Sequence, residues 1–295
     1  MYNEDITTFR SIFKGASMPN KAFLEITNAC NLSCSFCHGT KRPIRYISRE
    51  EFTHAATELR PFADYLYFHL MGEPLLHPDL ADFFEIAHGL GFRVILTTNG
   101  TLLKKRADVL LNAPGLFKVS VSLHSYEANS LSIPPEQYLD ECFDFCDRAS
   151  AQGIVSVMRL WNIGGEDNLN TQILDRMHAR FPGEWRTIFS GYKIRHKLFL
   201  EWGEKFEWPD PEADYCGDTH SCHGLRDQVG VLSNGTVVPC CLDADGVIAL
   251  GNLFETPLAD ILSCKRAVRM RSAFDRHRVT EPLCQRCGFA HMKNF

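Results

Sequence analysis

Three cysteines near the start of the chain, Cys30, Cys34 and Cys37, have the spacing C-x3-C-x2-C. Thiolates are soft ligands that bind iron–sulfur clusters or zinc. A structural zinc site takes four protein ligands, whereas three cysteines on a four-iron cluster leave one iron open to another molecule. The spacing therefore favours a [4Fe–4S] cluster with one open iron. Zinc with a nearby fourth ligand, such as His38, is the alternative.

A second set of cysteines lies in the last third of the chain. Cys222 precedes a hairpin signal at residues 229–238, Cys240 ends that hairpin, and Cys284 and Cys287 form a C-x2-C pair after a helical pattern. The hairpin and the helix both return the chain to the same end, so these four thiolates can close a complete site. We expect a second [4Fe–4S] cluster that is fully ligated by protein, with a structural zinc ribbon as the alternative.

Composition limits the classes of protein that this chain can represent. It has 295 residues, 45% of them hydrophobic, 12 cysteines and a formal net charge of -5. A chain of this length and hydrophobic content can form a packed core in one large domain, or in a large and a small domain. The acidic balance argues against nucleic-acid partners, and no apolar run is long enough to span a membrane. Without a secretory signal we expect a cytoplasmic protein, in which reduced cysteines serve as metal ligands.

The elements that must position the first cysteines alternate between strands and helices. Apolar strand patterns are followed by helical ones, and the first helix begins with a capping box formed by Ser48 and Glu51. The expected strands are 22–27, 65–71, 93–98, 118–123 and 154–161, and the later helices are 78–90, 104–113, 135–152 and 168–181. This alternation predicts a mostly parallel sheet covered by helices, with ligands at the carboxyl ends of the strands. We expect one or two strands in 188–201 and a helix over 258–277.

Three segments resemble the motifs of one enzyme family. Residues 30–37 are similar to the signature loop of the radical S-adenosylmethionine (radical SAM) superfamily. Residues 71–78 resemble its Gly-Gly-Glu-Pro element, with Met71 in place of the first glycine, and residues 97–101 resemble the end of its third strand. The resemblance implies a partial (β/α)6 TIM-like barrel with a small C-terminal iron–sulfur extension made of a β-hairpin and a helix.

The same resemblance implies a reaction and a set of cofactor contacts. The open iron would bind the methionyl part of S-adenosylmethionine, which is cleaved by an electron to give a 5′-deoxyadenosyl radical that abstracts a hydrogen atom. Glu73 would accept from the cofactor ammonium, Gly72 would allow close backbone approach, and Phe36 would pack near the adenine. Polar residues at other strand ends are further candidate contacts: Asn99, Ser122, His124, Ser125, Arg159 and Asn162.

The C-terminal segment resembles the twitch or SPASM extension of this superfamily. The similarity covers residues 235–240 and 250–253 and the pair Cys284 and Cys287, while the cysteine run of the longer two-cluster version is absent. The resemblance thus implies two clusters in all, the second accepting or relaying one electron, and a flavodoxin- or ferredoxin-type electron donor. We divide the chain into an N-terminal segment 1–20, a radical SAM core 21–210 and an auxiliary-cluster domain 211–295.

The expected substrate is a small molecule, such as an alcohol or a sugar, that is dehydrogenated or epimerised. The chain resembles aminocyclitol dehydrogenases in architecture and cysteine spacing. Epimerisation needs a hydrogen donor, for which Cys241 is the candidate, although an alternative cluster ligand or a buried thiol is the simpler interpretation. Modification of a ribosomally made peptide is one alternative, although few residues precede Ala22 to build a recognition domain. A non-enzymatic metal-binding module is the other.

Several residues have simple structural interpretations. Cys142 and Cys146 are four residues apart on an expected helix and should pack in the core, while Cys216 and Cys264 remain unassigned. The four tryptophans are candidates for the wall of a substrate pocket, although such residues more often belong to the core: Trp161, Trp185, Trp202 and Trp208.

Overall fold

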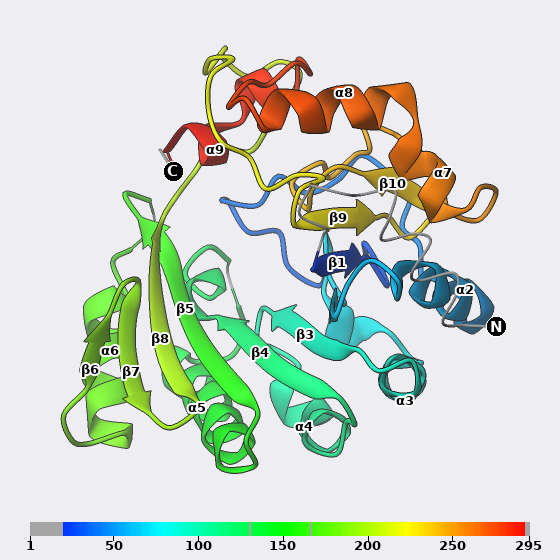
Figure 1. Cartoon of the computed structure of the whole chain (residues 1–295). Helices are drawn as coiled ribbons and strands as arrows, with labels where there is room; N and C mark the ends of the chain where they lie inside the picture. The colour runs from blue at the N-terminus through cyan, green and yellow to red at the C-terminus, as the bar shows by residue number, and fades with distance from the viewer. Residues whose placement is uncertain (1–19, 130, 166, 293–295) are drawn as a thin grey trace.

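The computed structural model describes residues 20–129, 131–165 and 167–292, so nearly all of the segment 1–20 lies outside the described residues (Figure 1). Its centre is an 11-stranded sheet in the order β11-β10-β9-β1-β2-β3-β4-β5-β8-β7-β6. The strands are β1 (Lys21–Leu24), β2 (Tyr65–Tyr67), β3 (Arg93–Thr98), β4 (Leu116–Ser122), β5 (Val155–Ile163), β6 (Arg186–Ile188), β7 (Gly191–Arg195), β8 (Leu198–Glu204), β9 (Gln228–Val231), β10 (Thr236–Val238) and β11 (Gly251–Asn252).

Strands β1 to β5 and β8 run parallel to one another. They form the curved half-barrel of Figure 1, which confirms the α/β fold class expected from the sequence. Beyond β8, the antiparallel strands β7 and β6 complete this side of the sheet. Residues 186–204 thus form three strands, where the sequence predicted one or two over a shorter range.

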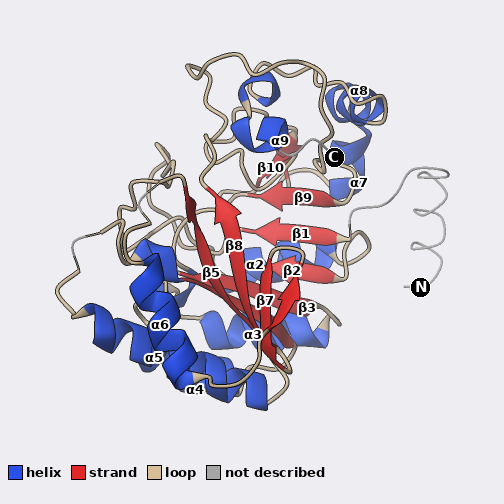
Figure 2. Ribbon diagram, turned by 90° about the vertical axis from the view of Figure 1, so that its left-hand side faces the viewer, coloured by secondary structure: helices blue, strands red, loops and turns tan. Residues whose placement is uncertain are grey.

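Helices connect the parallel strands and cover one face of the sheet (Figure 2). They are α2 (Arg49–Leu59), α3 (Leu80–Gly89), α4 (Leu103–Leu111), α5 (Pro135–Ala151) and α6 (Asn170–Arg180), with short 3-10 turns η1 (Pro74–Leu76) and η2 (Leu123–Ser125) after β2 and β4. The capping box predicted at the start of α2 is present, since Ser48 accepts from the Glu51 backbone and Glu51 accepts from the Ser48 backbone. A local sequence signal therefore sets the start of α2, whereas α3 to α6 begin without a side-chain cap.

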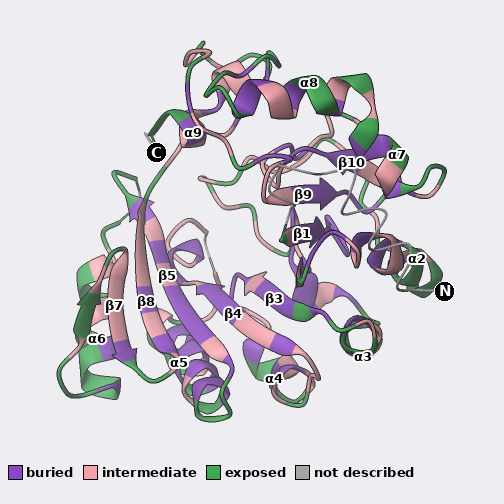
Figure 3. Ribbon diagram, viewed as in Figure 1, coloured by how far each residue is buried: buried purple, intermediate pink, exposed green. Residues whose placement is uncertain are grey.

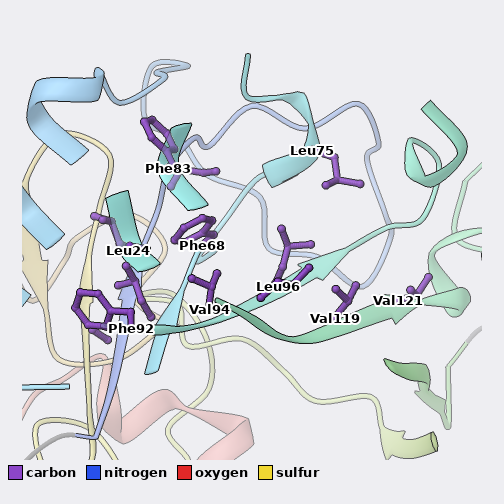
Figure 4. Packing of buried hydrophobic residues seen from close by; sticks show 14 of the residues in the cluster. Leu24, Phe68, Leu75, Phe83, Phe92, Val94, Leu96, Val119 and Val121 are labelled. Carbon is purple, nitrogen blue, oxygen red and sulfur yellow. The ribbon is translucent and has the colours of Figure 1, made fainter. Parts of the chain in front are cut away.

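The core lies between these helices and the sheet (Figures 3 and 4). Alternate strand residues point toward the helices and are fully buried, among them Leu66, Val94, Leu96, Val119 and Val121. Because strand side chains alternate between faces, their neighbours along each strand point to the opposite, concave face. That face is where polar strand residues gather.

The C-terminal extension is joined to the core through a strand. Its hairpin of β9 and β10 is the one that the sequence predicted, and β9 pairs in parallel with β1 from Lys21 to Leu24. The extension therefore continues the sheet of the core, which no local pattern predicted.

The rest of the extension is helical. It comprises α7 (Leu258–Ser263), α8 (Lys265–Phe274), the turn η3 (Cys284–Arg286) and α9 (Gly288–Met292). The single helix expected over 258–277 is therefore wrong, because Cys264 leaves the helical conformation and caps α8 by accepting from the Ala267 backbone. Among the described residues, no helix is both long enough and apolar enough to cross a bilayer.

Candidate radical SAM and auxiliary cluster sites

The first three cysteines lie on a loop that follows β1. Hydrogen bonds hold the two ends of this loop together. The Thr27 hydroxyl donates to the Arg45 carbonyl at 2.8 Å, and the Asn28 side chain both donates to Pro43 and accepts from the Arg45 backbone. These bonds close residues 30–42 into a loop held at its neck. The loop is also held from outside, since Asn99 donates to Asn31 and the Thr40 hydroxyl donates to Asp245.

Each of the three thiols lies in partly desolvated surroundings. The Asn129 side chain donates to Cys34 Sγ at 3.1 Å, and the Gly39 backbone donates to Cys37 Sγ at 3.4 Å. Burial nevertheless raises the pKa of Cys34 to about 11 and raises the pKa values of Cys30 and Cys37. Desolvation thus disfavours the thiolate forms of these cysteines, as it also does for the core thiols of Cys142 and Cys146.

Glu73 lies beyond β2, and only 1% of this residue is exposed. One carboxylate oxygen accepts from the Leu75 backbone at 3.0 Å and the other from the Asn99 backbone at 2.7 Å. Burial raises the pKa of Glu73 to about 7, against the effect of these hydrogen bonds. The carboxylate therefore joins the ends of β2 and β3, and its contact with the cofactor ammonium stays a prediction.

Gly72 has a φ of +77°, and a Cβ at this position would lie 2.4 Å from the Thr27 carbonyl oxygen and 2.8 Å from that of Ala29. A glycine is therefore required where the chain leading to Cys30 passes over the end of β2. This close approach is between two protein segments. Met71, which replaces the family's other glycine, is buried beside them.

Asn99 connects the end of β3 to the cysteine loop. Its side-chain nitrogen donates to Asn31 at 3.0 Å and lies 4.0 Å from Cys30 Sγ, while its oxygen accepts from the Thr101 backbone and hydroxyl. The third motif thus lies directly beside the first.

The ends of β4 and β5 meet the same loop. His124, in η2, is 6% exposed, and its ring centroid lies 4.6 Å from that of Phe36. Burial lowers the pKa of His124 to about 4, so the ring is neutral near pH 7. Ser122 is the register partner of Arg159 across the two strands. The structure therefore brings together the candidate contacts Phe36, Ser122, His124 and Arg159.

The other two candidates serve local structure. The Asn162 amide exchanges two hydrogen bonds of 3.1 Å with Asn170 at the start of α6. The Ser125 hydroxyl donates to the carbonyls of Ser122 and Asn99. Their contacts with the cofactor remain predictions.

Arg159 belongs to a charged group on the concave face of the sheet. Its Nε lies 3.3 Å from one oxygen of Glu201, and Lys118 Nζ lies 3.5 Å from the other. The guanidinium also lies 4.5 Å from the centre of the Trp161 ring. Two cations thus share one carboxylate, which leaves this group with an excess of positive charge.

Two neutral polar residues complete the concave face. Removal from bulk water raises the pKa of Tyr67 to about 12 and lowers the pKa of His69 to about 3, and Arg159 acts electrostatically on both. Sequence reasoning missed Tyr67, His69, Lys118 and Glu201. The available signal was a polar residue at alternate positions of an otherwise apolar strand, as in Leu116–Ser122.

The second set of cysteines encloses a buried cavity. Cys222, Cys240, Cys284 and Cys287 line it together with the His220 ring. Burial raises the pKa values of all four thiols, that of Cys287 to about 11. In the described part of the chain, no three His, Cys, Asp or Glu side chains are arranged to hold a single metal ion. The four thiols surround this cavity, and their role as cluster ligands stays a prediction.

Of the remaining cysteines, Cys142 and Cys146 are fully buried in α5, so the prediction of core packing is confirmed. Cys241 packs against the same small hydrophobic cluster as Tyr67 and Trp208, and it acts electrostatically on the pKa values of both Tyr67 and Cys240. This thiol therefore lies between the concave face and the second set of cysteines. The Cys216 backbone donates to the carbonyl of Gln285 at 2.7 Å.

An open groove of about 640 Å³ lies between the end of β8 and α9. Its walls are mainly apolar and include Trp161, Trp202, Phe206 and Phe289, with Glu201 at the side of the concave face. Two of the four candidate tryptophans therefore line a pocket. The other two pack elsewhere, Trp185 on the main core and Trp208 against the first cysteine loop, where its indole donates to the Phe36 carbonyl at 3.0 Å. Since Phe289 follows Cys287 by two residues, the groove lies next to the second set of cysteines.

Comparisons with known proteins agree with these two sites. A family model described as "Radical SAM superfamily" matches residues 24–174. A second model, SPASM, described as "Iron-sulfur cluster-binding domain", matches residues 222–288. The two matches contain both sets of cysteines.

The sequence similarity to curated relatives covers part or most of the chain. A probable GTP 3′,8-cyclase of Methanothermobacter marburgensis is 32% identical, and the match covers 76% of this chain and 85% of that protein. An AdoMet-dependent heme synthase of Methanosarcina barkeri is 32% identical over 109 residues, where the chain spans about a third (31%) of that relative's length.

Solved structures share the fold at low sequence identity. A crystal structure of BtrN in complex with AdoMet and 2-DOIA has a TM-score of 0.61 and 20% identity, covering 92% of this chain and 94% of that one. Streptococcus suis SuiB bound to precursor peptide SuiA has a TM-score of 0.60 and 16% identity, covering 99% of this chain and 75% of that one.

Proposed function

Because the chain belongs to the radical SAM superfamily and ends in a SPASM iron–sulfur domain, we propose that it abstracts a hydrogen atom from a small-molecule substrate. Its cofactors, S-adenosylmethionine and [4Fe–4S] clusters, supply the radical chemistry when bound. The observation that carries the choice of substrate is the polar concave face, where Lys118, Arg159 and Glu201 form one charged group beside the cysteine loop.

Three loop cysteines, Cys30, Cys34 and Cys37, would ligate the first cluster and leave one iron for the cofactor. Phe36 and the neutral ring of His124 form an aromatic surface for the adenine. Ser122 and Arg159, at the adjoining strand ends, offer a hydroxyl and a cation to the ribose and the carboxylate. Among these groups His124 is buried, which favours exclusion of water from this part of the site.

A hydroxyl-rich substrate such as an alcohol or sugar suits the residues of the concave face. Glu201 can accept from hydroxyl groups, whereas Lys118, Tyr67 and His69 can donate to them. These residues would orient the substrate and supply few hydrophobic contacts. The auxiliary cluster, held by Cys222, Cys240, Cys284 and Cys287, would take up an electron in a dehydrogenation.

Epimerisation is the other outcome that the site allows. In that reaction the substrate radical receives a hydrogen atom from a thiol, and the place of Cys241 between the concave face and the auxiliary site supports this role. Solvent exchanges thiol hydrogens, so in D₂O an epimerase would place deuterium in its product. A dehydrogenase would not, and Cys241→Ser would leave its rate largely unchanged.

Peptide modification is a second candidate, which the apolar groove favours. The aromatic walls at Trp161, Trp202, Phe206 and Phe289 suit apolar side chains better than sugar hydroxyls. A peptide lying in this groove would pass between the concave face and the auxiliary site. The fold shared with SuiB is compatible with this candidate but does not favour it over the first.

The test of the proposal begins with cofactor cleavage under anaerobic reduction. We expect the reconstituted chain to release 5′-deoxyadenosine, Cys34→Ala to abolish this release, and Cys284→Ala to retain it with about half of the iron lost. Cleavage by Cys34→Ala would overturn the assignment of the first site. Unchanged iron in Cys284→Ala would overturn that of the second.

Deuterated candidate substrates then distinguish the substrate classes. Aminocyclitols and sugars, a short apolar peptide and GTP, after the named relative, are offered in turn, and deuterium in 5′-deoxyadenosine is measured. Transfer from the first group supports the proposal, and transfer from the peptide or GTP alone contradicts it. A flavodoxin- or ferredoxin-type donor in the cytoplasm, where thiols stay reduced, completes the proposal.

A further inference from the structure

His220 has no assigned role, although it lies within the wall of the auxiliary cavity. It precedes Cys222 by two residues and lines the cavity together with all four auxiliary cysteines. The residue is only 7% exposed, and among the described residues neither ring nitrogen makes a hydrogen bond. The backbone of Cys284 is close enough to affect its pKa without meeting hydrogen-bond geometry.

A buried N–H without a partner is expensive, costing about 1–3 kcal/mol, and native proteins rarely leave one so. The other residues around this cavity offer His220 few acceptors. The Asp243 carboxylate accepts from the backbones of Val247 and Ile248, both at 2.8 Å. The apolar neighbours Ile248, Val279 and Leu283 have no side-chain acceptor. Besides the four cysteine sulfur atoms, the backbone carbonyl of Cys284 is the acceptor close to the ring, and it does not meet hydrogen-bond geometry.

We propose that His220 donates an N–H···S hydrogen bond to the auxiliary iron–sulfur cluster, either to an inorganic sulfide or to a ligating thiolate. Such a bond stabilises the more negative, reduced cluster and so raises its reduction potential. His220 is then a positioning residue that tunes how readily the cluster accepts an electron. The inference rests on the cluster assignment and is independent of the substrate.

The experiment compares three variants of the full chain. His220→Phe removes the N–H and keeps a ring, and His220→Gln retains a donor. His223→Gln is the matched control, because His223 also flanks Cys222 but faces Asp227 at 2.8 Å with about half of its side chain exposed. Each is combined with Cys30→Ala, Cys34→Ala and Cys37→Ala, so that only the auxiliary cluster contributes to the spectrum.

An EPR-monitored redox titration gives the midpoint potential of each variant. We expect His220→Phe to lower it, His220→Gln to lower it less and His223→Gln to leave it unchanged, all with about four irons per chain. An unchanged potential in His220→Phe overturns the proposal. Iron loss in both His220 variants but not in His223→Gln also overturns it, because His220 would then be a ligand.

A second measurement keeps the test decisive should the triple cysteine background fold poorly. In the otherwise wild-type holoenzyme, pulsed EPR of the reduced auxiliary cluster in D₂O detects exchangeable deuterons near the sulfur atoms. We expect one strongly coupled deuteron to disappear in His220→Phe and to persist in His223→Gln. Its persistence in His220→Phe would assign the hydrogen bond to another donor.

Discussion

Two adjacent residues beyond β2 control how closely the cysteine loop can approach the sheet. Gly72 makes room for the carbonyls of Thr27 and Ala29, and Glu73 holds the start of η1 to the end of β3. The family motif predicted that both positions matter near the cofactor. In the structure both residues also make contacts within the protein. Substituting either residue therefore tests those contacts, even when no cofactor is bound.

Substitution of Gly72 by alanine should displace the cysteine loop. The left-handed backbone costs alanine about 1–2 kcal/mol, and its Cβ would overlap two carbonyl oxygens. We expect Gly72→Ala to lose the iron of the first cluster, about half of the total. Gly153→Ala is the control, because Gly153 has a φ of +88° and nothing within 4 Å. Full iron content in Gly72→Ala would contradict the assigned contact.

The buried carboxyl of Glu73 predicts a dependence of stability on pH. Its pKa rises from 4.5 to about 7 in the folded chain, so the protonated form is favoured there. The stabilising effect is complete below about pH 4.5 and is lost as the pH rises through 7, in total about 3 kcal/mol. Relative to wild type, Glu73→Gln should gain thermal stability from pH 5 to pH 8. If the melting temperatures of Glu73→Gln and wild type differed by the same amount at every pH in this range, the raised pKa of Glu73 would be refuted.

At the scale of elements, Cys264 breaks what the sequence presents as one helix. Its thiol accepts from the Ala267 backbone at 3.4 Å and so begins α8. Cysteine is an unusual N-cap, and no side-chain pattern distinguishes it from a helical residue in the middle of an amphipathic segment. The sequence therefore predicted the helical content here but not the break.

Replacement of Cys264 by serine tests whether this thiol is a cap or a ligand. Serine is among the preferred N-cap residues, so Cys264→Ser should keep or raise the stability, by up to about 1 kcal/mol. Cys264→Ala should lower it by a similar amount. Iron content should be unchanged in both, and a loss of iron in Cys264→Ser would show that the thiol ligates a cluster.

Other elements show why prediction succeeded or failed. The strand over Arg93–Thr98 and the helix that starts at Pro135 were predicted closely, because apolar periodicity and turn residues act within each segment. The structure brings the four C-terminal cysteines to one cavity as the sequence suggested, while the role of both cysteine sets as cluster ligands stays a prediction. The concave-face residues were missed because Lys118 of β4 and Glu201 of β8 meet only when both strands pair with β5, which lies between them.

At the scale of the whole molecule, a buried carboxylate connects the core to the extension. Glu25, at 0% exposure, accepts from Arg42 of the cysteine loop at 2.7 Å and from Ser233 of the extension at 2.9 Å. Arg42 in turn donates to the Ala244 carbonyl. One ion pair therefore connects β1, the loop and the hairpin that leads to Cys240.

Removal of Arg42 should weaken all of these connections together. Arg42→Met leaves the Glu25 charge buried without its partner, and we expect a loss of about 3–5 kcal/mol in the free energy of unfolding. The double variant with Glu25→Gln should recover part of the loss. Arg49→Met, which breaks an exposed pair with Asp82, should cost less than about 1 kcal/mol in the same denaturant titration. Equal effects of the two arginine variants would contradict a central role for Arg42.

The parallel pairing of β9 with β1 also governs how this chain can be shortened or recombined. Truncation after β8 would strip β1 of its outer neighbour and leave a row of unsatisfied backbone groups beside the strand that leads to Cys30. Such bare edges recruit strands from other molecules. A single-cluster fragment cut by gene truncation should therefore aggregate, and transplanting this C-terminal module onto another scaffold would require carrying β1 along with it.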